Sequence, residues 1–227
     1  MKRFYREAVA ADGRILLDGR PVRTPLKAVL AVPAPPLAAA IAAEWQAQGD
    51  QVDPRSMPLT RVAATAIDRV APQRAHAEAE TLRFGASDLL CYRAEAPADL
   101  AAAQHAAWQP LLDWAAVQLD AALVVTSGLM PADQPEGAMT ALAAAVRAHD
   151  DFALAGLHAL AAGLGSLVLA LAVSHGRLDA GAAFAAAQID EEHQASRWGR
   201  DGEMEARRRA LAADIADAAR FLSLLRG

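Results

Sequence analysis

The 227-residue sequence contains a single cysteine, and this scarcity excludes two kinds of structural support. One thiol cannot form an intrachain disulfide, so the fold is not cross-linked in the way of small secreted domains. A zinc site built from cysteines is excluded as well. Cys91 lies in the apolar run 89–92. There we expect a small buried hydrophobic side chain rather than a nucleophile.

Sequence signals for secretion and for phosphate binding are also missing. The first residues lack the apolar run of a secretory signal, so we expect a cytoplasmic protein. The glycine-rich stretch 163–166 lies inside an apolar run, without a preceding strand or a following lysine, and matches neither nucleotide-binding fingerprint. We expect Ser166 to be a small packing residue and the protein to need no cofactor.

The overall charge gives no sign of a nucleic-acid partner. The chain has a net charge of −5 and a pI of about 5.7, so it does not attract nucleic acid or an anionic membrane as a whole. The charge is uneven, because residues 1–27 hold seven Lys or Arg against three acidic residues. We expect an ordinary solvated strand surface there, and a basic contact face is the alternative.

A stretch without formal charge, 152–176, is long enough to cross a bilayer. It is filled with alanine and glycine, contains His158 and His175, and has no marked Lys/Arg asymmetry at its ends. We therefore predict a buried central helix, with a membrane-associated helper as the alternative.

The order of turn, strand and helix signals predicts an α+β fold. Asp12-Gly13 and Asp18-Gly19 are hairpin turn signals, with strands expected at 14–17 and 28–32. Helical spacing follows the prolines at 33–36 and again after Pro58 and Pro72. We predict a small N-terminal α/β domain with an antiparallel meander at 1–95 and an all-helical, orthogonal bundle at 96–227. The expected helices of the bundle are 98–120, which Pro110 should kink or split, 135–148, 151–175, 179–198 and 203–225.

The densest cluster of polar and aromatic groups in the helical half lies at 184–199. Helical spacing predicts one stripe that contains Phe184, Gln188, Glu191, Ala195 and Trp198. Glu191 would then share a face with two aromatic side chains. A buried bare carboxylate costs several kcal/mol, so we expect it to be hydrogen-bonded, protonated or reserved for a partner. We expect Asp190, His193 and Arg197, on another face, to be solvated.

Catalytic interpretations of this cluster have little support. Asp190 and His193 have the three-residue spacing of a di-metal bundle ligand pair, but the helical half has no second acid-x-x-His pair. Glu191 and Glu192 point about 100° apart on a helix and cannot flank one scissile bond. We expect no enzyme activity, and a metal-dependent enzyme using the 190–193 cluster is the alternative. A tryptophan beside a carboxylate is typical of protein interfaces, although a core position is the default.

Several motifs occur together in the order typical of one family. They are Phe4-Tyr5, LDGRPV at 17–22 with Thr24-Pro25, Glu44-Trp45 with Gln48, MPLT at 57–60 with Thr65 and Asp68, DLLCYR at 88–93, WQPLL at 108–112, and Asp190-Glu191 with Gln194 and Trp198-Gly199. The chain resembles the assembly chaperones that bind the alpha subunit of the soluble catalytic head of F-type ATP synthase. The likeness extends from Phe4 to about Leu222.

This resemblance implies a chaperone without ATPase activity, which holds the free alpha subunit until the beta subunit replaces it. It also implies a small N-terminal α/β domain joined to a C-terminal helical bundle. The acidic residue of the family's Glu-x-x-Gln-x-x-x-Trp-Gly motif corresponds to Glu191, so the expected partner-binding residues are Glu191, Gln194 and Trp198. We expect a monomer without nucleic acid or stable membrane insertion, located in the cytoplasm of a bacterium or, for organellar relatives, in the mitochondrial matrix.

Overall fold

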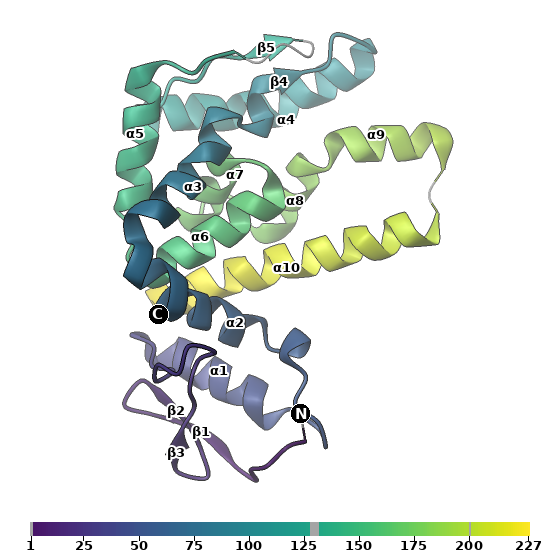
Figure 1. Ribbon diagram of the computed structural model, residues 1–227. Coiled ribbons are helices and arrows are strands. Elements are labelled where there is room, and N and C mark those ends of the chain that lie inside the picture. The colour runs from purple at the N-terminus through teal and green to yellow at the C-terminus, as the bar shows by residue number, and fades with distance from the viewer. Residues whose placement is uncertain (1, 128–131, 200) are drawn as a thin grey trace.

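The computed structural model describes residues 2–127, 132–199 and 201–227. It begins with three antiparallel strands, β1 (Ala8–Ala11), β2 (Arg14–Leu17) and β3 (Arg20–Pro21), in the order β1-β2-β3 (Figure 1). The two predicted Asp-Gly turns connect them, with φ of 51° and 73° in the first and 47° and 78° in the second. Positive φ at both central residues is what a two-residue hairpin turn of type I′ requires, so this prediction is confirmed.

The strand expected at 28–32 does not form a continuous ladder. Val29 makes an isolated bridge with Arg23, and Ala31 makes another with Arg14. Arg23 lies just after β3 and Arg14 lies in β2, so each part of the segment pairs with a different neighbour and no ladder extends. The expectation of a strand here was wrong, although the segment does join the sheet.

Helix α1 (Pro35–Gln46) lies against the sheet and also caps α2 (Pro58–Thr65). Met57, at the N-cap of α2, supplies no side-chain cap. Instead, Glu44 of α1 accepts hydrogen bonds from the backbone N–H of Leu59 at 2.7 Å and of Thr60 at 2.8 Å. Burial raises the pKa of Glu44, and the bonds from Thr60 and Leu59 oppose that rise. The carboxylate thus satisfies backbone donors that a helix start leaves unpaired.

The helix after α2 is not regular. A π-helical turn (Ala66–Val70) and a 3₁₀ turn (Ala71–Gln73) join α2 to α3 (Arg74–Ala86). The helix-like sequence predicted on either side of Pro72 is confirmed, but no residue pattern indicated the π turn. Helix α3 packs on α5 (Glu136–Arg147) and α6 (Asp151–Leu164).

The remaining described chain is mainly helical and contains a short parallel pair, β4 (Tyr92–Arg93) and β5 (Thr126–Ser127). Its other helices are α4 (Ala98–Gln118), α7 (Leu167–Ser174), α8 (Ala180–Ala187), α9 (Ile189–Trp198) and α10 (Gly202–Arg226). Helix α4 continues through Pro110, so the helix is not split there, and the alternative of a kink stays a prediction. The α+β class, with a small sheet region followed by a helical region, is confirmed.

The helix predicted at 151–175 is divided into α6 and α7 at Gly165 and Ser166. Gly165 has φ of 64°, a left-handed conformation that ends α6 and suits glycine. Ser166 then caps α7 by accepting a hydrogen bond from Leu169 N–H at 3.0 Å. Its hydroxyl also donates to Asp88 at 2.7 Å. Ser166 therefore has a hydrogen-bonding role, contrary to the expectation of a packing residue.

Asp88 joins this break to the rest of the core. The side chain is 0% exposed and accepts from Ser166 Oγ, from Val168 N–H at 2.9 Å and from Leu90 N–H at 3.1 Å. Burial raises the pKa of Asp88 to about 6, although these donors oppose the rise. A buried carboxylate is tolerated here because each of its two oxygens accepts at least one hydrogen bond.

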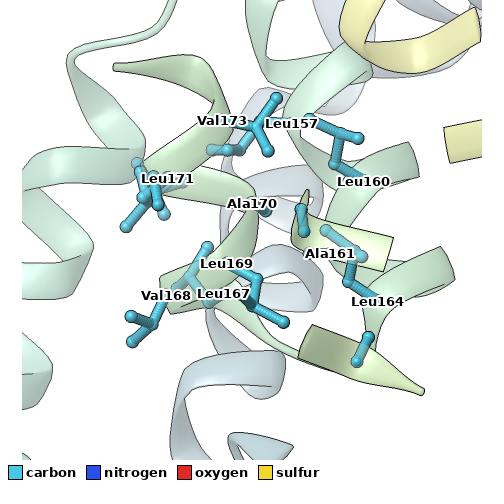
Figure 2. Packing of buried hydrophobic residues seen from close by; sticks show 14 of the residues in the cluster. Leu157, Leu160, Ala161, Leu164, Leu167, Val168, Leu169, Ala170, Leu171 and Val173 are labelled. Atoms are coloured by element: carbon cyan, nitrogen blue, oxygen red, sulfur yellow. The ribbon is translucent and has the colours of Figure 1, made fainter. Parts of the chain in front are cut away.

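The main core lies between α6 and α7. Figure 2 shows Leu157, Leu160 and Leu164 of α6 beside the apolar side chains of α7, and every α7 residue from Leu167 to Val173 is buried. The prediction of a buried central segment is confirmed. Cys91 is buried in the same core, and burial raises its thiol pKa to about 12. None of the described helices is long and apolar enough to span a membrane.

A smaller apolar cluster joins the sheet, α1 and the start of α2, with Phe221 of α10 inserted among them. The main cluster begins at Ala66 and includes the helical half. The division into domains at 1–95 and 96–227 stays a prediction about units that fold on their own.

Candidate partner-binding surface

Helices α9 and α10 form a hairpin that extends from the helical body, at the right of Figure 1. No residue of α9 is buried. The buried residues of α10 are Ile215, Ala218, Phe221 and Leu222, all in its C-terminal half. We call residues 189–198 and 202–211 the α9–α10 arm. None of these residues is buried, which is unusual for elements that only support a core.

The predicted stripe is interrupted at Gln188. This residue has φ of −107° and ψ of 16°, so the helix expected at 179–198 ends there and a new one, α9, begins. Phe184 remains in α8, where it is buried and lies 5.0 Å from the Arg208 guanidinium carbon. Glu191 is exposed rather than buried beside two aromatic rings. The expected cost of burying its carboxylate therefore does not arise.

Glu191, Gln194 and Trp198 do share one face of α9. Their steps of three and four residues place them on the same side of the helix, and all three are exposed. Trp198 is 87% exposed, which is exceptional for the largest apolar side chain. Among the described residues, none forms a hydrogen bond or ion pair with the side chains of these three. We call them the outer face of α9.

The expectation that Asp190, His193 and Arg197 are solvated is correct for Arg197, which is exposed, and wrong for Asp190 and His193, which are half-buried against α4. Gln104 of α4 donates to Asp190 Oδ1 at 2.6 Å. His193 Nε2 and an Arg197 guanidinium nitrogen each lie 3.3 Å from Asp99 Oδ2. The hydrogen bond with His193 is the main cause of a lowered pKa at Asp99. These contacts hold α9 against the start of α4, which spacing within α9 alone could not reveal.

A groove of about 390 Å³ separates the two helices of the arm. Ala195, Met204 and Leu211 give it an apolar lining, and Glu191 stands at its edge. Met204 is 48% exposed. Across the groove, Glu192 pairs with Arg208 at 2.6 Å, which ties α9 to α10. Sequence reasoning missed Met204 because it lies on the following helix.

The structure gives the alternative metal chemistry no geometric support. Asp190 accepts a hydrogen bond from Gln104 of α4, and His193 is hydrogen-bonded to Asp99 of the same helix. Within residues 2–127, 132–199 and 201–227, no group of three or more His, Cys, Asp or Glu side chains could hold a metal ion. What the arm offers is an exposed tryptophan, a carboxylate, an amide and an apolar groove, a combination suited to binding a protein.

The sequence model of the family described as ATP12 chaperone protein matches residues 2–116.

The chain belongs to the ATP12 chaperone family.

Solved structures extend the match over the arm. Atp12 from Paracoccus denitrificans has a TM-score of 0.93 and 46% identity, over 99% of this chain and 98% of its own. An aspartate-to-lysine mutant of the same protein matches equally well. A candidate chaperone from Agrobacterium tumefaciens has a TM-score of 0.92 and 42% identity, over 99% of this chain and 85% of its own.

Membership gives the general function: this chain is an ATP12-type assembly chaperone of ATP synthase. The family match ends within α4, so it does not include the arm. The structural matches do include it, and they show that the whole fold is shared.

Proposed function

We propose that this ATP12 chaperone binds the free alpha subunit of F-type ATP synthase and is released when the beta subunit takes its place. The outer face of α9 would make the contact. The observation that carries this proposal is Trp198, which is 87% exposed beside Glu191 and Gln194.

An exposed tryptophan supports a docking role for a physical reason. A side chain of this size buries about 150–250 Å² when covered, and tryptophans are enriched among the residues that dominate binding energy. Glu191 and Gln194 add polar groups that can fix the register of a partner. Apolar area would thus supply affinity, and the two polar side chains would supply specificity.

The support behind α9 fits the same role. Asp99 and Gln104 hold the helix on α4, and Arg208 holds it on α10. The backbone under the outer face is therefore positioned before a partner arrives. Preorganisation of this kind strengthens binding because less conformational freedom is lost.

Release by the beta subunit requires no chemistry. A subunit that awaits its ring partners exposes an apolar surface, and binding that surface lowers the concentration of the aggregation-prone form. A beta subunit that occupies an overlapping surface with higher affinity would displace the chaperone by mass action.

A displacement assay tests the proposal. Purified chaperone and alpha subunit are mixed, the complex is isolated by size-exclusion chromatography, and beta subunit is added. The proposal requires a chaperone–alpha complex, no chaperone–beta complex, and free chaperone after the addition. If the chaperone binds beta alone, or remains bound when alpha and beta assemble, the proposed order of events is wrong.

A further inference from the structure

A second groove, of about 650 Å³, lies on the N-terminal part of the molecule, outside the α9–α10 arm. The loop at 24–28 forms one wall, and α2 with the π turn forms another. Its lining includes the buried apolar side chains Val22, Leu30 and Met57. Four cations also line it, namely Arg23, Lys27, Arg61 and Arg69. We call this the basic groove.

The wall made by the loop is held in place by a buried carboxylate. Asp68 accepts from Thr24 Oγ1 at 2.6 Å and from the backbone N–H of Leu26 at 2.9 Å. Asp68 belongs to the π turn, and π turns inside helices are frequent at functional sites. Leu26 consequently lies at the lip of the groove with 63% of its surface exposed. The groove is thus built by contacts between segments far apart in the sequence.

The positive charge of the basic groove is only partly compensated by acidic side chains. Of its four cations, Arg61 pairs with Asp214 of α10 at 3.6 Å. Within the part of the chain that the structure describes, no carboxylate pairs with the side chains of Arg23, Lys27 or Arg69. Asp68 also lines the groove; its bonds from Thr24 and Leu26 come from neutral donors, so its negative charge offsets part of the positive charge. A protein with a net charge of −5 therefore carries a concentrated cationic site.

The sequence predicts an ordinary solvated strand surface for the basic residues of 1–27, whereas the structure places two of them in a groove with two cations of another segment. Arg23 and Lys27 come from the sheet region, whereas Arg61 and Arg69 come from the helical segment 58–70, and all four meet around one apolar floor. Trp45 adds an aromatic side chain to the lining.

We propose that the basic groove is a second docking site, for an acidic polypeptide segment that also carries apolar side chains. Carboxylates of the segment pair with Lys27 and Arg69, and its apolar side chains cover Leu26 and the floor. A small inorganic anion would leave the floor uncovered. A flat anionic membrane would not enter a concave site, and the net charge of the protein repels it.

The test uses two synthetic peptides and one charge-reversed protein. A fluorescein-labelled peptide of alternating Glu and Leu is titrated with the full-length chaperone, and binding is followed by fluorescence anisotropy. The same peptide with Lys in place of Glu is the opposite-charge control. The double variant Lys27→Glu/Arg69→Glu should bind the acidic peptide at least about tenfold more weakly, because two favourable charge contacts become repulsive.

Matched variants separate this site from the general effect of charge. Arg20→Glu changes an exposed cation of β3 that does not line the groove, and its affinity should stay within about twofold of the wild type. Leu26→Asp should weaken binding as the charge reversal does. Thermal unfolding of each variant shows whether the fold is intact.

Three outcomes overturn the proposal. The first is an absence of acidic-peptide binding to the wild type, and the second is equal binding by the Lys–Leu peptide or by the double variant. The third is binding to phosphatidylserine vesicles but not to the acidic peptide, which would make the site a membrane contact. None of these measurements uses the alpha subunit, so their result is independent of the function proposed above.

Discussion

Replacement of Trp198 by alanine should separate binding from folding. The side chain is 87% exposed and lies on a helix without buried residues, so its loss should change the free energy of unfolding by less than about 0.5 kcal/mol. Covering a tryptophan removes about 150–250 Å² from water. At about 25 cal/mol per Å², this gives an upper bound of about 4–6 kcal/mol for its contribution to binding.

Part of that energy is lost in ordering the interface, so we expect a net loss of about 2–4 kcal/mol. This corresponds to a dissociation constant for the alpha subunit that is weaker by a factor of about 30 or more. Isothermal titration calorimetry measures the affinity, and thermal unfolding followed by circular dichroism measures the fold.

The control for this substitution is Phe4→Ala, which removes an exposed aromatic side chain of the N-terminal region. Phe4 is 66% exposed and does not belong to the outer face of α9. Its loss should leave the affinity for the alpha subunit nearly unchanged. Equal affinities for the wild type and the Trp198→Ala protein would refute the assignment of the outer face.

Three further predictions concern the core and the support of the arm. Asp88→Ala should lower the free energy of unfolding by about 3 kcal/mol in denaturant titrations, because it leaves three buried donors without their acceptor; an unchanged midpoint would contradict this. The folded-state pKa of Asp88, about 6, lies above its usual value of 3.8, so the folded protein takes up this proton first. Its contribution to stability is therefore greatest below pH 4 and is lost as the pH rises through 6, a change of about 3 kcal/mol that should be missing from Asp88→Asn. Asp99→Ala removes the contacts with His193 and Arg197 and should speed hydrogen exchange in α9 with little change in the melting temperature, since exposed ion pairs add little stability. Exchange rates identical to those of the wild type would show that Asp99 does not hold the helix.

The sequence predicted best those features that depend on neighbouring residues. The Asp-Gly turns and the helix starts at prolines follow from backbone preferences of one or two residues, and they are found as expected. At the break between α6 and α7, Gly165 ends one helix and Ser166 caps the next. This pair of residues is a recognisable helix-break signal, but it lies inside a continuous apolar run, and we therefore predicted one unbroken helix. The break at Gln188 has neither glycine nor proline, so local sequence could not locate it.

The candidate site was predicted only in part for a similar reason. Helical spacing placed Glu191 and Trp198 on one face, because that relation lies within a single helix. It could not show that Asp99 and Gln104 meet the other side of α9, since those residues come from α4. Phe184 was assigned to the same stripe because the spacing assumed an unbroken helix.

The most direct test of the central claim is hydrogen exchange, measured by mass spectrometry, of the chaperone with and without saturating alpha subunit. The arm has few buried contacts, so its amides should exchange readily in the free protein and become protected in the complex. We predict protection of the segment 189–198, with no comparable change in the buried helix α7. A complex with the alpha subunit that leaves the exchange of 189–198 unchanged would show that another surface binds the partner.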